Sequence, residues 1–129
     1  MINALLTGNS MRVNKRKAAE IYPFLEAYIA HREAQITEIE QAIGRYEKRR
    51  AMEERSYQSM SAFRRIFAGK KPDHHLAVEY IHYVKKPMEQ IRSLRLEVEQ
   101  ARAILTESQP TDLIDVSEEL EKELQSKPV

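Results

Sequence analysis

Apolar residues recur every three or four positions along most of the chain, which is the spacing of one face of an α-helix. The first run begins at Leu25 and alternates steps of four and three residues as far as Phe67. This is the a/d pattern of a coiled coil, although four polar residues interrupt it. We therefore predict a long helix over residues 22–68 with the seam Leu25, Ile29, Arg32, Ile36, Ile39, Ile43, Tyr46, Arg50, Glu53, Tyr57, Met60, Arg64 and Phe67.

A glycine and a proline then interrupt the helical pattern. Gly69 suits the left-handed residue that follows a helix end, and Asp73 suits the cap of the next helix. We predict a turn at 69–73 and a second helix over 74–107, which should end before Pro110.

The second helix has an apolar seam of the same spacing. Its members are Ala77, Tyr80, Val84, Pro87, Ile91, Leu94, Val98, Ala101 and Leu105, with Met88 beside it. Pro87 removes one backbone hydrogen bond inside this helix, so we predict a kink after Lys85 and Lys86.

The two seams together predict an antiparallel helical hairpin. In such a pair, facing residues have numbers with a constant sum, and seam pairs from Met60 with Tyr80 to Ile36 with Leu105 sum to 140 or 141. The same register places Glu47 opposite Arg95 and Glu40 opposite Arg102. Exposed pairs of this kind contribute about 0 to 1 kcal/mol each, so they indicate register rather than stability. We predict an all-α, coiled-coil-like hairpin.

Both ends of the chain differ from the hairpin in charge. Residues 1–21 form a basic N-terminal arm, with a possible short helix capped by Asn14, and residues 108–129 form an acidic segment. We predict that the acidic segment is a short amphipathic C-terminal helix, capped by Thr111 or Asp112, with a frayed tail. Its apolar stripe is Leu113, Val116, Leu120 and Leu124. Its acids, Asp112, Asp115, Glu118, Glu119, Glu121 and Glu123, can neutralise Arg12, Lys15, Arg16, Lys17 and Arg32.

Composition supports this assignment and narrows the class of protein. The chain has 129 residues, 32% of them charged, and only three glycines, which suits one helical domain. The absence of cysteine excludes disulfides and thiolate metal sites. The first residues lack a secretory signal, and no apolar run approaches the roughly 18 residues of a membrane span. We expect a cytoplasmic protein.

No motif of high specificity for catalysis is present. His75, Glu79 and His82 have the spacing of a helical carboxylate and histidine metal site, but the motif occurs once and the predicted register puts it on the outer face. The three glycines are isolated from one another, so no phosphate-binding loop exists. We predict no enzyme activity and no cofactor, and a metal-binding helical bundle is the third alternative.

Basic residues gather near the predicted turn: Arg64, Arg65, Lys70 and Lys71. Such a cluster can contact phosphates, so a nucleic-acid-associated protein is the first alternative function. The net charge of +1 argues against it, because a nucleic-acid binder needs a wider basic face.

The apolar stripe also widens near the turn, beyond what two helices can cover. We therefore predict a protein partner, or a second copy that completes a four-helix bundle, on a contact face of Phe63, Phe67, Leu76, Ile81, Tyr83 and Met88. The favoured function is a small interaction or regulatory protein that binds without chemistry, with the basic residues near the turn orienting an acidic partner. A monomer covered by its own termini remains open.

Overall fold

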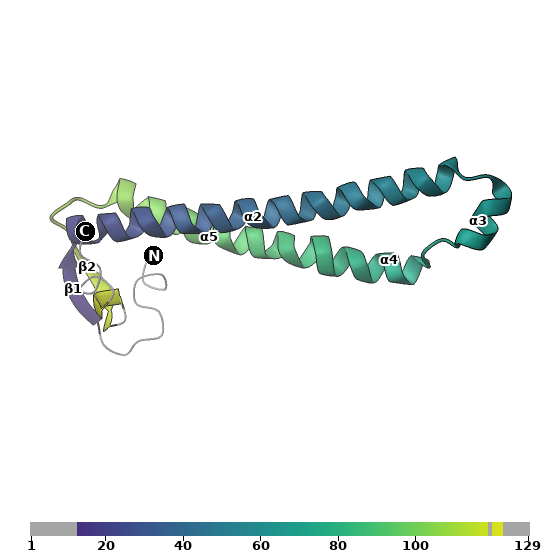
Figure 1. Ribbon diagram of the computed structural model, residues 1–129. Coiled ribbons are helices and arrows are strands. Elements are labelled where there is room, and N and C mark those ends of the chain that lie inside the picture. Colours follow the sequence, from purple (N-terminus) through teal and green to yellow (C-terminus); the bar gives the residue numbers. More distant parts are fainter. Residues whose placement is uncertain (1–12, 119, 123–129) are drawn as a thin grey trace. The chain divides into compact units, whose positions relative to one another are not determined.

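The computed structural model describes residues 13–118 and 120–122 of the chain (Figure 1). The all-α prediction is confirmed, because a long helix packs against a second helical segment. The elements in order are β1 (Val13–Lys17), α2 (Ala18–Ser59), α3 (Ala62–Ala68), α4 (Asp73–Tyr80), η1 (Ile81–Lys85), α5 (Lys86–Glu107) and β2 (Leu113–Ser117). No helix in the described part of the chain is long and apolar enough to cross a membrane.

The chain divides into two compact units, and both α2 and α5 contribute residues to each. The first unit takes Met1–Ala34 and Ser93–Val129, and the second takes Gln35–Arg92. In each unit, part of α2 packs against a helical segment that runs in the opposite direction (Figure 1).

The core of the first unit joins side chains from two helices, one strand and the segment that follows that strand. Side chains from α2, α5 and β2 are buried together with Leu120, and the cluster is Ile21, Leu25, Ile29, Val98, Ala101, Ile104, Val116 and Leu120. The first backbone N–H groups of α2 are satisfied from the segment after α5, because Ala18 donates to Asp112 O at 2.8 Å and Ala19 to Pro110 O at 3.1 Å. As predicted, α5 stops before Pro110.

A two-stranded antiparallel sheet stands where the sequence suggested helical ends. β1 pairs with β2 from Val13 opposite Ser117 to Lys17 opposite Leu113, so Asn14 caps no helix. Asp112 does not cap a helix over 113–117 either, because its carboxylate accepts from Gln109 N–H and closes a turn. The β-branched residues of β2 favour a strand. Val116 lies on the inner side of this strand, where it is buried in the core.

A short helical segment does follow β2, as the prediction of a C-terminal helix requires. It begins at Glu118, and Ser117 caps it by accepting a hydrogen bond from Leu120 N–H at 3.1 Å. Val116 and Leu120 of the predicted apolar stripe are buried, whereas Leu113 is 65% exposed. Leu124, Glu119 and Glu123 lie outside the described residues.

The acidic segment neutralises part of the basic arm, as the charges predicted. Arg16 forms an ion pair with Glu121, and Lys15 lies 4.0 Å from Asp115. Arg32 is different, because its guanidinium lies 3.0 Å from Glu97 of α5. The sequence had grouped Arg32 with the cations that the C-terminal acids neutralise, and the structure gives it this additional acidic partner on α5.

The seam predicted on the first helix is confirmed from Leu25 to Met60, where every member is buried or half-buried. The helix itself is shorter than predicted, because α2 ends at Ser59 and α3 is a separate helix. At this end Ser59 Oγ donates to Ser56 O at 2.9 Å, a local bond of the kind that competes with the backbone bonds of a helix. Arg64 and Phe67 therefore leave the seam and are exposed.

The early end of α2 changes which residues face each other, so the predicted register was wrong. Tyr46 stacks on Tyr83 with ring centroids 4.8 Å apart, and Arg102 bonds Glu33 at 3.0 Å. The prediction had placed Tyr46 opposite Leu94 and Arg102 opposite Glu40. The connection includes α3 as well as the predicted turn, so Tyr46 and Glu33 face residues earlier in the second helical segment than the predicted register gave.

A π-helical turn, η1, stands at the position where a kink was predicted. Lys86 N–H donates to Ile81 O, five residues back, directly before Pro87. A regular helix would press the Pro87 ring against the carbonyl four residues earlier, and the wider turn avoids this clash.

A π-helical turn holds one residue more than an α-helical turn, and this rotates α4, the helix that precedes η1, relative to the predicted seam. Ala77 and Tyr80, predicted on the seam, are exposed, whereas Leu76 and Glu79 are half-buried. From Val84 onward the predicted seam holds, with Ile91, Leu94, Val98 and Ala101 buried.

Candidate interaction surface

α3 is a helix of seven residues whose side chains are all outside the core. Its start is fixed by Ser61, whose hydroxyl accepts from Arg64 N–H at 3.3 Å. Its end is fixed by Gly69, whose N–H donates to Arg65 O at 3.2 Å and whose φ is +70°. Gly69 has the positive φ predicted for it. α3 is therefore a capped helix with both ends defined.

Arg65 holds α3 against the end of α2. Its guanidinium donates to Tyr57 O at 3.2 Å and also to Gln58 O, and it lies 5.7 Å from the centre of the Tyr57 ring. The last carbonyls of a helix have no partner within that helix, so a cation placed there stabilises the helix end. Arg65, predicted to orient an acidic partner, thus makes an internal contact.

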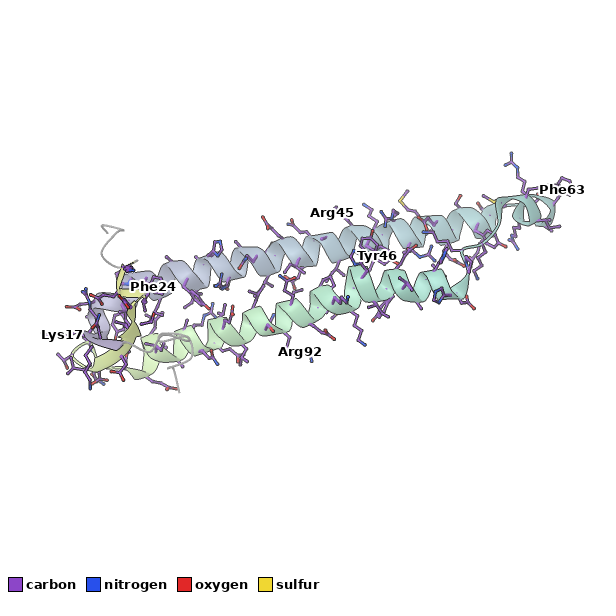
Figure 2. All side chains as sticks on the ribbon, turned by 90° about the horizontal axis from the view of Figure 1, so that it is seen from below. Lys17, Phe24, Arg45, Tyr46, Phe63 and Arg92 are labelled. Carbon is purple, nitrogen blue, oxygen red and sulfur yellow. The ribbon has the colours of Figure 1, made fainter. Side chains whose placement is uncertain are left out.

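Large apolar side chains cover the outside of α3. Phe63 is 70% exposed, Ile66 77% and Phe67 76%. Phe63 and Phe67 meet edge to face with ring centroids 5.0 Å apart, and Figure 2 shows Phe63 projecting from the helix. The spacing i, i+3 and i+4 puts the three on one face of α3. Ile66 was missed because the a/d pattern of a continuous helix gave it no special position.

The other residues of the predicted contact face differ in how far they are exposed to solvent. Ile81 and Tyr83 are each 43% exposed and Met88 is 54% exposed, while Leu76 is half-buried. Tyr83 gives one face of its ring to Tyr46, which Figure 2 shows on α2. Two apolar residues of α4, Val78 and Tyr80, are exposed as well. Tyr80 had been predicted on the buried seam, and Val78 had no predicted role.

Lys71 also makes internal contacts, as Arg65 does. Its ammonium lies 2.9 Å from Glu79 and 3.6 Å from Glu53. The hydrogen bond from Lys71 lowers the pKa of the Glu79 carboxyl, and one from Arg50 lowers that of Glu53. Conversely, the bond to Glu79 raises the pKa of Lys71. Of the four basic residues predicted near the turn, Lys71 forms ion pairs and Arg65 donates to backbone carbonyls, whereas the side chains of Arg64 and Lys70 make neither contact within the described residues.

Glu79 faces α2 rather than solvent, contrary to the predicted register. It accepts a hydrogen bond from the Tyr46 hydroxyl at 3.2 Å, and burial, with the nearby Glu79 charge, raises the pKa of Tyr46. The π-turn causes this by rotating α4. His82 instead packs against Tyr83, and His75 against His74. Across residues 13–118 and 120–122, no three His, Cys, Asp or Glu side chains gather as a metal ion would require.

Comparison with known proteins identifies no relative of this chain. No family model, curated protein or solved structure matches the chain.

Proposed function

We propose that the chain is a cytoplasmic, non-enzymatic interaction protein that inserts α3 into an apolar groove of a partner protein. The observation that carries this proposal is the exposure of Phe63, Ile66 and Phe67 on a helix that has no buried residue. Apolar anchors at i, i+3 and i+4 are the pattern by which a helix binds in a groove.

The energy available from α3 limits the affinity. Complete burial of a large apolar side chain contributes about 1.5–3 kcal/mol. Three such anchors give roughly 5–9 kcal/mol before the loss of translational and rotational freedom is subtracted. A micromolar Kd needs about 8 kcal/mol net, so α3 alone binds more weakly than that. We propose that Ile81, Tyr83 and Met88 extend the contact.

Charge orients the partner in this proposal. Arg64 and Lys70 flank the apolar anchors and form no ion pair within the described residues, so an acidic rim on the partner groove would complement them. Arg65 and Lys71 make internal contacts, which leaves fewer cations for phosphates than the sequence suggested. This favours a protein partner over a nucleic acid.

The proposal is tested by quantitative capture from a lysate of the native host. The bait is the wild type, a Phe63→Asp/Phe67→Asp variant, or a Leu96→Asp control that changes an exposed leucine of α5. Circular dichroism first verifies that each bait is folded.

We expect one or more proteins to be lost with the α3 variant and kept with the control. A second copy as the partner would show in sedimentation as a wild-type dimer that the α3 variant cannot form. Identical captured sets and identical sedimentation for all three baits would contradict the proposal.

A further inference from the structure

A groove of about 690 Å³ opens in the second unit, between the last turns of α2 and the segment that joins α3 to α4. Six of its lining residues are basic and two are acidic. It lies beside α3 in the chain, but none of the three α3 anchors lines it. The inference drawn from it therefore does not depend on the proposed function of α3.

The positive charge of the groove is only partly neutralised from within. Glu53 is paired with Arg50 at 2.7 Å and with Lys71 at 3.6 Å. Arg45 and Lys48 make no ion pair within the described residues and are exposed. The groove therefore has a basic rim that an anionic ligand can complement.

Its apolar part is formed by flexible side chains. Met52 and Met60 line it together with Leu76, and Met52 is 60% exposed. Thioether side chains adapt to irregular apolar shapes and are frequent where proteins bind peptides of varied sequence. A basic rim beside an adaptable apolar surface complements an amphipathic anion.

We infer that this groove binds an acidic amphipathic helix of a partner protein. Leucine-like side chains of that helix would contact Met52, Met60 and Leu76, and its carboxylates would pair with Arg45 and Lys48. A second copy of this chain is a poorer occupant, since its acidic segment already pairs with β1 through Asp115 and Glu121.

Nucleic acid also fits the groove less well. Binding of unpaired bases relies on aromatic side chains with a free ring face. The one aromatic residue lining the groove is Tyr57, and the guanidinium of Arg65 lies over its ring. A peptide needs no such stacking surface.

The test measures fluorescence anisotropy of a labelled synthetic peptide of leucine and glutamate, with leucines at i, i+3, i+4 and i+7. A scrambled peptide of the same composition and a labelled single-stranded oligonucleotide are the comparison probes. Full-length wild type is compared with Arg45→Glu/Lys48→Glu, and with Arg92→Glu, a basic residue of α5 outside the groove.

We expect the amphipathic peptide to bind the wild type and the Arg92→Glu control equally. The double reversal should weaken binding at least tenfold, because two attractive charges become repulsive. The Phe63→Asp/Phe67→Asp variant should bind this peptide as the wild type does, which separates this inference from the proposed function. Equal binding of the scrambled peptide, tighter binding of the oligonucleotide, or no effect of the double reversal would overturn it.

Discussion

Adjacent residues near the end of α5 give a sharp test of the core. Ile104 is 1% exposed and belongs to the core of the first unit, whereas Leu105, its neighbour, is only half-buried against that core. The sequence seam had placed Leu105 inside. Replacing each residue by alanine removes the same number of carbon atoms, so the pair isolates the effect of burial.

The expected magnitudes differ by more than the error of the measurement. Ile104→Ala removes three buried carbons at about 0.8 kcal/mol each, roughly 2.4 kcal/mol. The cavity left in a packed core raises the loss to about 3–4 kcal/mol, of which better helix propensity returns a few tenths. Leu105→Ala loses about half the transfer energy and leaves little cavity, so we expect about 1 kcal/mol.

Urea unfolding followed by far-UV circular dichroism measures both free energies of unfolding. The two variants should differ by about 2 kcal/mol, with similar m-values. A larger loss for Leu105→Ala than for Ile104→Ala would contradict the deeper burial of Ile104 in this unit.

Three further predictions concern the second unit. Gly69→Ala should destabilise the end of α3 by about 1–3 kcal/mol, because an alanine is strained at a φ of +70°. Gly44→Ala lies in a helix with open space around the added methyl group, so it should stabilise the protein by about 1 kcal/mol. Thermal unfolding temperatures that move in the same direction for both variants would contradict this. Glu53 and Glu79 have pKa values below the ordinary 4.5, so their stabilising effect is complete above that value and is lost as the pH falls through the lowered values. Glu79→Gln should therefore flatten the acid limb of the stability profile, and an unchanged limb contradicts the Lys71 contact. Ser61→Ala should remove the cap of α3 and cost about 1 kcal/mol, seen as faster amide exchange within α3; unchanged exchange contradicts the cap.

Much of the helical pattern was predictable from the sequence. The spacing from Leu25 to Met60 and from Val84 to Ala101 reports burial directly, because a helix buries one face and the period of that face is visible in the residues. Gly69 and Pro110 marked real helix ends for the same kind of local reason.

The register was not predictable, because it depends on where α2 ends. Seam spacing is preserved if one helix slides along the other, so several registers satisfy it equally well. The end at Ser59 coincides with a local serine contact, and the rotation of α4 accompanies a π-turn before Pro87. Neither appears in a pattern of apolar positions.

The strands were missed for a different reason. Residues 113–117 alternate imperfectly, and their β-structure depends on pairing with Val13–Lys17, about a hundred residues earlier in the chain. The candidate surface was found in part, since Phe63 and Phe67 were named. Ile66 was missed because α3 was expected to continue α2.

Site-specific photo-crosslinking from Phe67 tests the central claim most directly. A photoreactive phenylalanine analogue at position 67 keeps an aromatic side chain, and the same analogue at Leu96, also exposed, is the control. After irradiation in the native host, we expect a covalent adduct with a distinct protein, or with a second copy, from position 67 and not from position 96. No adduct at position 67, or the same adducts at both positions, would contradict the proposal that α3 is the binding element.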